Sequence, residues 1–205
     1  TIIRYSIKMI IGICGLMGSG KDTIANHLIQ KHQFKKISFA DKLKESVATM
    51  FDWDKTMLDG QTDESRQWRE KPDEYWSKEV GKSITPRFVL QKFGTECMRD
   101  NFYDGIWVSM TKKKILDNPN SSWVIPDVRF ENEVKMIKSI GGQVWWVRRG
   151  ELPTWFRVYQ DIGVEPKDVH PSEWAWAKAD FDKILDNNST VDGLRNQVQD
   201  HLVSI

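Results

Sequence analysis

Short apolar runs alternate with helical patterns along most of this chain. The first run, Lys8–Cys14, is mostly apolar, which is typical of a parallel strand buried on both faces. Apolar residues then recur at helical spacing, at Ile24, Ala25, Leu28 and Ile29. This stretch therefore predicts a strand, a short loop and a helix.

The same alternation continues along the rest of the chain. Four more strands are predicted, at Lys36–Ala40 (ending at Asp41), Ser122–Asp127, Gln143–Val147 and Asp182–Leu185. Helices are predicted over 43–51, from Thr85 to near Gly94, over 105–116, over 130–140 before Gly141 and Gly142, and after a cap at Ser189 and Asp192. Alternating strands and helices predict an α/β fold, with a parallel five-stranded sheet covered by helices on both faces.

The chain is expected to form one domain with two insertions. Its core is predicted from residues 1–41, 119–148 and 178–205. The polar and highly charged stretch 52–84 marks a larger inserted lobe at about 42–118, and loop-rich residues at about 149–177 mark a second insertion. Ligands of such sheets bind at the carboxyl ends of the strands, so we expect the functional residues at that edge.

A glycine-rich loop follows the first predicted strand. Residues 15–23, Gly-Leu-Met-Gly-Ser-Gly-Lys-Asp-Thr, fit the phosphate-binding pattern G-x-x-x-x-G-K-[ST] with one substitution. Asp22 occupies the last position of the pattern, and the hydroxyl comes one residue later, at Thr23. Glycines let several backbone N–H groups point at one phosphate, while the lysine and the helix N-terminus add positive charge. The flanking strand and helix favour a nucleotide-binding loop over a chance glycine-rich turn.

Composition narrows the choice of partners and compartment. Lys and Arg number 30 and Asp and Glu 29, a net charge of +1, so we expect local phosphate recognition and no nucleic-acid binding. Cys14 and Cys97 make neither a disulfide framework nor a metal cluster, which indicates a reducing cytoplasm. No apolar run approaches ~20 residues, so no membrane span is expected.

Three kinds of nucleotide chemistry use a phosphate loop. A GTPase switch would carry an Asn-Lys-x-Asp motif, which this sequence lacks. An ATP-driven ATPase usually has a glutamate after the acid that ends the strand, whereas Asp127 is followed by Val128. A kinase must keep water from the γ-phosphate while an acceptor docks, which requires a second pocket, a lid and arginines. The two insertions, both with arginines, favour the kinase.

Further motifs occur in one order along the chain. They are Phe39-Ala40-Asp41, Thr85-Pro86-Arg87 with Leu90-Gln91 and Gly94-Thr95-Glu96, Pro126-Asp127-Val128-Arg129-Phe130 with Asn132-Glu133, His170-Pro171-Ser172-Glu173, and Asp186-Asn187-Asn188. With the phosphate loop, this set resembles the deoxynucleoside monophosphate kinases of tailed bacteriophages, over nearly the whole chain and most weakly over 52–84. The resemblance implies a fold of the P-loop nucleoside monophosphate kinase type. It also implies transfer of the ATP γ-phosphate to a deoxynucleoside monophosphate.

Two alternatives stay open at this point. One is another P-loop small-molecule kinase, of the dephospho-coenzyme A or phosphomevalonate type. The other is an ATPase or nucleotide-dependent binding protein. In the favoured interpretation the larger insertion binds the acceptor and the smaller one, at about 149–177, is a lid. The partners are then small-molecule nucleotides in the cytoplasm, that of a host cell if the protein is viral. A homodimer is compatible with the sequence.

The ATP-binding and metal-binding residues are predicted mainly from the loop. The ATP set is Gly15, Gly18, Ser19, Gly20, Lys21, Thr23, Arg148 and Asn187. Lys21 is expected to bridge the β- and γ-phosphates. The candidate ligands of Mg²⁺, directly or through water, are Asp22, Thr23 and Asp127. The plain alternatives are a helix-start acid for Asp22 and a strand-end cap for Asp127.

The predicted catalytic set is Lys21, Asp22, Asp127 and Arg129. Arg129 could reach the acceptor or the transferred phosphate with its bidentate guanidinium, or form a salt bridge with Glu133. The predicted acceptor site comprises Asp41, Arg87, Gln91, Arg129 and Glu173, with Arg87 on the phosphate and Gln91 on the base edge. Arg87 and Gln91 could also be solvated helix positions, and Asp41 a helix cap.

Overall fold

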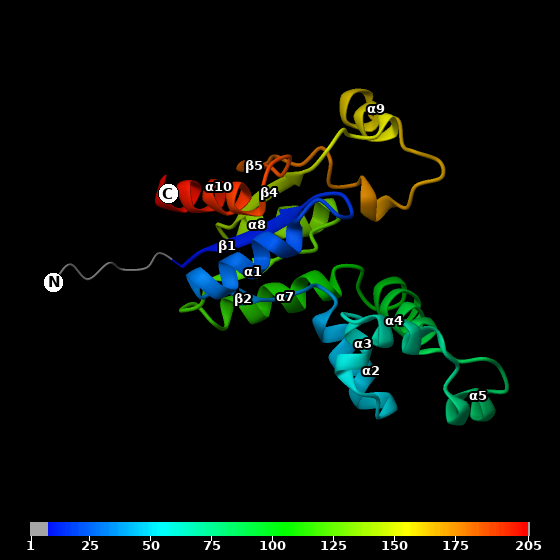
Figure 1. Cartoon of the computed structure of the whole chain (residues 1–205). Coiled ribbons are helices and arrows are strands. Elements are labelled where there is room, and N and C mark those ends of the chain that lie inside the picture. Colours follow the sequence, from blue (N-terminus) through cyan, green and yellow to red (C-terminus); the bar gives the residue numbers. More distant parts are fainter. Residues whose placement is uncertain (1–7, 205) are drawn as a thin grey trace. The chain divides into compact units, whose positions relative to one another are not determined.

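The computed structural model describes residues 8–204, so the first seven residues of the predicted core and residue 205 lie outside the described part. Two compact units divide the chain (Figure 1). The sheet unit comprises residues up to Ser38 and from Lys112 onward, and the helical unit comprises Phe39–Thr111.

Within residues 8–204, five parallel strands form the sheet, as predicted. They are β1 (Ile10–Cys14), β2 (Lys35–Lys36), β3 (Trp123–Ile125), β4 (Gln143–Arg148) and β5 (Lys183–Asp186), in the order β2-β3-β1-β4-β5. The chain leaves β1 toward one edge of the sheet and β3 toward the other. Such a change of direction opens a crevice at the carboxyl end of the central strand, where ligands bind.

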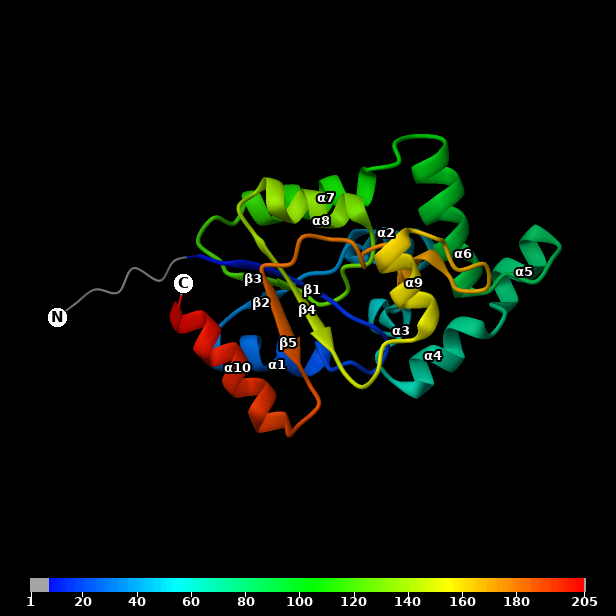
Figure 2. The ribbon, with the colours of Figure 1, turned by 90° about the horizontal axis from the view of Figure 1, so that it is seen from above.

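Helices cover both faces of this sheet, as predicted (Figure 2). On one face, α1 (Lys21–His32) and α10 (Val191–Ser204) pack together over a core that includes Ile13, Leu28 and Val198. On the other face, α8 (Glu131–Ser139) packs against β1 and β4. Burial of both faces explains why the strands are nearly continuous apolar runs.

Aromatic residues anchor the segment after β4 to the sheet. This segment, predicted from the sequence to be loop-rich, contains α9 (Thr154–Ile162) and a 3₁₀ turn (Pro171–Glu173). Phe156 of α9 and Trp176 are fully buried, and both pack against Trp146 of β4. The loop prediction was therefore wrong for α9. The apolar pattern of this helix is short, and the helix is buried through long-range aromatic contacts that its own sequence does not show.

The end of β2 and the start of α10 also differ from expectation. The predicted strand Lys36–Ala40 is reduced to Lys35–Lys36, although the Ile37 N–H still donates to the Val124 oxygen of β3 over 3.1 Å. Asp41 therefore does not end a strand. The helix α10 is capped by Thr190 and not by Ser189, because the Thr190 hydroxyl accepts the Gly193 N–H over 3.1 Å.

The helical unit packs around a separate core. Its helices are α2 (Asp41–Phe51), α3 (Lys55–Asp59), α4 (Asp63–Glu70), α5 (Glu74–Val80), α6 (Pro86–Gln91), a π-helical turn region (Lys92–Asp100) and most of α7 (Ile106–Leu116). The fully buried side chains of Val47 and Leu58 lie at the centre of this core. The Thr85 hydroxyl accepts the Phe88 N–H over 3.1 Å, which confirms the predicted start of α6.

The helix that begins at α6 does not stop near Gly94, as the sequence predicted. It continues as the π-helical region to Asp100, and buried Gly94 packs against Leu43 of α2. The Trp107 indole N–H donates to the Gly94 oxygen over 2.9 Å. This tertiary hydrogen bond supplies a donor to a carbonyl where the regular helical bonding pattern changes.

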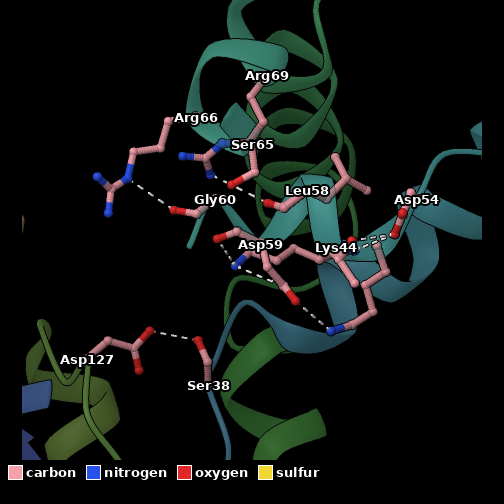
Figure 3. A network of polar contacts seen from close by, with 12 residues as sticks. Ser38, Lys44, Asp54, Leu58, Asp59, Gly60, Ser65, Arg66, Arg69 and Asp127 are labelled. Atoms are coloured by element: carbon pink, nitrogen blue, oxygen red, sulfur yellow. Dashed lines mark hydrogen bonds and ion pairs between the residues drawn. The ribbon is translucent and has the colours of Figure 1, made fainter. Parts of the chain in front are cut away.

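Basic side chains cap the carboxyl end of α3 (Figure 3). Lys44 donates to the Asp59 oxygen, Arg66 to the Gly60 oxygen over 3.2 Å, and Arg69 lies 3.5 Å from the Leu58 oxygen. Cations stabilise the free carbonyl groups at a helix end. This network ties α2 and α4 to α3. Among the helices of residues 8–204, none combines the length and apolar character that crossing a membrane requires.

Candidate active site

The glycine-rich loop connects β1 directly to α1 at the carboxyl edge of the sheet. Gly15 has a φ of +156° and lies so close to β4 that a Cβ there would stand 2.5 Å from the Val147 oxygen. A residue with a side chain therefore does not fit at this position without moving the backbone. The strand–loop–helix context that the pattern required is present in the structure.

The Lys21 side chain folds back over this loop. Its Nζ donates to the Gly15 oxygen over 2.7 Å and to the Leu16 oxygen over 2.8 Å. Burial lowers the pKa of Lys21, and the Arg129 guanidinium lowers it further, whereas the Asp22 and Glu173 carboxylates oppose the change. Lys21 thus lies in an electrostatic cluster that brings together three of the predicted site residues besides itself.

Asp22 and Thr23 occupy the first turn of α1. Asp22 is exposed and Thr23 is partly buried. An acid in this turn interacts favourably with the positive end of the helix. The β1 residue Cys14, next to the loop, is buried, and burial raises the pKa of its thiol, so it stays protonated as a small apolar side chain.

Asp127 follows β3 and is partly buried. The Ser38 hydroxyl donates a hydrogen bond to its Oδ2 over 2.7 Å (Figure 3). Ser38 comes just after the residues that pair with β3, so the neighbouring strand delivers it to this acid. Ser38 was not among the site residues predicted from the sequence. The signal that could have found it is a hydroxyl at the end of a strand adjacent to the one that Asp127 ends.

Arg129 connects the loop after β3 to the 3₁₀ turn. Its Nη1 lies 3.4 Å from Glu173 Oε1 and 3.3 Å from Ser172 Oγ. The ion pair of its guanidinium is with Glu173, whereas Glu133, the alternative partner, binds the backbone of Arg129. About half of the Arg129 side chain is exposed, at 47%. A phosphate could therefore reach it.

Glu133 is a buried carboxylate beneath this loop. Its Oε2 accepts the N–H of Arg129 over 2.7 Å and the N–H of Phe130 over 3.1 Å, at the start of α8. Only 8% of Glu133 is exposed. Burial raises the pKa of Glu133 to about 7, against the two backbone hydrogen bonds, and the Asp127 carboxylate raises it too. Glu133 belongs to one of the ordered motifs of the sequence. Nothing in that motif indicated that its side chain is buried and binds the backbone N–H groups of Arg129 and Phe130.

A cavity of about 280 Å³ lies beside the loop, within the sheet unit. Its walls include Leu16 to Ser19 of the loop, the end of β4 and Glu151 to Pro153. Arg148 and Arg149 line it, and Arg148 Nε lies 3.2 Å from Asp186 Oδ2. The cavity therefore combines an apolar wall with positive charge next to the phosphate loop, a combination suited to a nucleotide.

Asn187 follows β5 and also reaches the loop. Its Nδ2 donates to the Ser19 oxygen over 2.8 Å. The structure thus brings together, at one edge of the sheet, the loop, Asn187, and the end of β4.

The remaining predicted acceptor residues belong to the helical unit. Asp41 is the first residue of α2, and Arg87 and Gln91 lie one turn apart on α6, both exposed. Arg87 Nη1 forms an exposed ion pair with Glu70 Oε1 at 2.8 Å. Arg87 therefore presents an accessible guanidinium whose present partner is a carboxylate.

The predicted metal ligands carry oxygen atoms. Asp22, Asp127 and the Thr23 hydroxyl offer the donor type that Mg²⁺ prefers. Within residues 8–204 no three His, Cys, Asp or Glu side chains cluster as a metal cage. Mg²⁺ beside a nucleotide typically uses one or two carboxylates and completes its shell with phosphate oxygens and water. The residues present therefore fit a nucleotide-bound Mg²⁺.

The parallel sheet and the glycine-rich loop with Lys21 define a phosphate-binding α/β protein of the P-loop class. A family model described as "Deoxynucleotide monophosphate kinase" matches residues 67–198. An Acanthamoeba polyphaga mimivirus protein named "Putative deoxynucleotide monophosphate kinase" is 32% identical over 203 residues, which cover 93% of this chain and 94% of that protein. The chain belongs to the deoxynucleotide monophosphate kinase family, and it is a kinase that uses ATP as co-substrate and small-molecule nucleotides as substrates.

Two solved structures show a distant likeness to the chain. A sugar kinase from Janibacter sp. HTCC2649 has a TM-score of 0.47 and 16% identity, covering 96% of this chain and 95% of that one. Shikimate kinase from Aquifex aeolicus has a TM-score of 0.44 and 16% identity, covering 96% and 97%. The family assignment rests on the family model and the viral relative alone.

Proposed function

We propose that this protein transfers the γ-phosphoryl group of ATP to a deoxynucleoside 5′-monophosphate, giving the diphosphate and ADP. One observation carries the proposal at the site: the loop lysine Lys21 and Arg129 share one electrostatic cluster at the carboxyl edge of the sheet. Two cations here can neutralise a phosphoryl group while it moves between two nucleotides. The family membership of the chain supports the same reaction.

The phosphate loop holds ATP in this proposal. Backbone N–H groups of Gly15, Gly18, Ser19 and Gly20 would surround the phosphates, and Lys21 would exchange its two loop carbonyl partners for phosphate oxygens. Arg148 lines the cavity beside the loop and would add positive charge. The protein positions and neutralises, and no covalent phosphoenzyme forms.

Asp22, Thr23 and Asp127 would hold Mg²⁺, directly or through water. When bound, Mg²⁺ neutralises charge on the phosphates. Ser38 restricts the rotation of the Asp127 carboxylate by holding Oδ2.

Acceptor binding is proposed for the inserted lobe at about 42–118, with Arg87 on the phosphate, Gln91 on the base edge and Asp41 lining the site. Arg129 and Glu173, which belong to the sheet unit, are also proposed as acceptor-binding residues. On phosphate binding, Arg129 can exchange its carboxylate partner for a phosphate, since both accept two parallel hydrogen bonds from a guanidinium. The segment at about 149–177 is proposed as the lid that excludes water.

We place the reaction in a reducing cytoplasm, that of a host cell if the protein is viral. We also propose that the protein is of the bacteriophage type within this family, because the ordered motifs of the sequence resemble that type.

A coupled assay of ADP release against a panel of deoxynucleoside monophosphates tests the proposal. We expect turnover that depends on at least one of them. Including dephospho-coenzyme A and phosphomevalonate in the panel separates the other small-molecule kinases. Turnover with neither dNMP nor these acceptors, but steady ATP hydrolysis, would contradict the proposal.

A further inference from the structure

Asn187 makes a long-range connection to the phosphate loop. Its Nδ2 donates to the Ser19 oxygen over 2.8 Å, although 168 positions separate the two residues in sequence. The partly buried side chain lies so close to the loop that a Cβ at Gly20 would stand 2.5 Å from the same Nδ2. Gly20 also has a φ of +108°, which side chains rarely allow. The absence of a side chain at Gly20 therefore makes room for the Asn187 amide.

The turn that carries Asn187 is itself held from two sides. The Asn187 N–H donates to the Arg148 oxygen of β4 over 2.9 Å. The preceding residue, Asp186, donates its N–H to Gln197 Oε1 over 3.0 Å and accepts from Gln197 Nε2 over 2.8 Å. Because β4 and α10 both fix this turn, Asn187 offers the loop a rigid hydrogen-bond donor.

We infer that Asn187 is a positioning residue that fixes the Ser19–Gly20 peptide of the phosphate loop. The C=O and the N–H of a trans peptide point in opposite directions. Holding the Ser19 oxygen toward Asn187 turns the Gly20 N–H to the other side, away from Asn187. A loop binds phosphate through N–H groups that converge, so the orientation of each peptide sets the affinity. The inference rests on the proposed function, because it takes this loop to bind the phosphates of ATP.

This role differs from direct recognition of the adenine base, which is the other role open to Asn187 as a member of the predicted ATP-binding set. A base reader affects only ligands that carry the base. A residue that orients the loop affects every ligand that carries the phosphate chain, whether or not a base is attached. The two roles therefore separate when ATP is compared with inorganic tripolyphosphate.

The test is calorimetric titration of the full chain with ATP and with tripolyphosphate, in the same magnesium buffer. Asn187→Ala removes the donor, and Asn187→Leu removes it with a side chain of similar shape, which guards against a cavity effect. One lost hydrogen bond predicts about tenfold weaker binding of both ligands by both variants. Asn118→Ala is the matched control, because the exposed Asn118 amide also donates to a backbone oxygen, that of Lys114, over 2.8 Å. It should leave both affinities unchanged.

Two results for the Asn187 variants would overturn the inference. Weaker ATP binding with unchanged tripolyphosphate binding would make Asn187 a base reader, and unchanged binding of both would remove it from the site. The measurement needs no acceptor, so its outcome is distinct from that of the turnover assay. A wild-type chain that binds both ligands without dNMP-dependent turnover contradicts only the proposed function, whereas one that binds neither contradicts both.

Discussion

Ser38 donates its hydroxyl hydrogen to Asp127 Oδ2 over 2.7 Å, and so joins two neighbouring strand ends at the candidate site. A hydrogen bond to a charged group is worth about 1.5–3 kcal/mol. The bond leaves the carboxylate fewer orientations, which matters for a group proposed to hold a metal ion near the reacting phosphate.

We therefore predict that Ser38→Ala lowers kcat by about tenfold, because Asp127 loses one restraint while its charge remains. Steady-state kinetics at saturating ATP would show this loss. Ser46→Ala is the matched control, since the Ser46 hydroxyl bonds only to the Lys42 oxygen of its own helix in the described contacts. Equal rates for Ser38→Ala and the wild type would contradict the role of this contact.

Lys21→Ala removes the cation that the loop carbonyls hold. We expect a loss of about 10²- to 10³-fold in kcat, of the size found when a group that stabilises transition-state charge is deleted. Lys31→Ala, at an exposed position of the same helix, controls for the loss of a lysine. If both variants kept the wild-type rate with intact circular dichroism spectra, Lys21 would not take part in transfer.

Arg129→Lys keeps the positive charge but not the planar pair of donors. A lysine cannot form the bidentate contact with a phosphate. The expected result is an increase of about tenfold in the KM for the acceptor, or an equal fall in kcat if the contact forms only in the transition state. Arg195→Lys, an exposed arginine paired with Asp192, should change neither constant. Wild-type kinetics for Arg129→Lys would show that Arg129 makes no bidentate contact with the acceptor or transferred phosphate.

Glu133 should make stability depend on pH near neutrality. The pKa of Glu133 is raised from 4.5 to about 7 in the folded chain, so between these values the folded state keeps a proton that the unfolded state has lost. Raising the pH through this window therefore favours unfolding. The contribution of Glu133 protonation to the free energy of unfolding is complete below pH 4.5 and is lost above about pH 7. It amounts to about 3 kcal/mol, at ~1.4 kcal/mol per pKa unit.

Urea unfolding at a series of pH values measures this dependence. Glu133→Gln keeps an oxygen that accepts the Arg129 and Phe130 N–H groups but cannot titrate, so its stability should lack this component. Glu131→Gln, an exposed position of the same helix paired with Lys135, should keep the wild-type slope. Identical slopes for the wild type and Glu133→Gln would contradict the prediction.

The sequence predicted the strands of the sheet because central parallel strands are apolar on both faces, as in Lys8–Cys14. It failed at the edge, where Lys36–Ala40 was predicted as a longer strand than the pairing with β3 permits. It also missed α9, whose burial depends on contacts of Phe156 with Trp146 and Trp176.

The residues of the candidate site likewise divide into those that a local pattern predicts and those that depend on tertiary contacts. The loop residues carry a local pattern, so they could be recognised from spacing alone. The contacts of Ser38 with Asp127, of Glu133 with the Arg129 backbone and of Asn187 with Ser19 join segments or backbone groups by tertiary geometry. No local pattern encodes such contacts, and the structure was needed to find them.

Acceptor-dependent release of ADP from ATP measures the proposed phosphoryl transfer itself. The wild-type chain should release ADP from ATP only when a suitable deoxynucleoside monophosphate is present, and the corresponding deoxynucleoside diphosphate should appear in equal amount. ATP hydrolysis at the same rate with and without every dNMP, and with no diphosphate formed from the acceptor, would show that the protein does not transfer phosphate to a deoxynucleoside monophosphate.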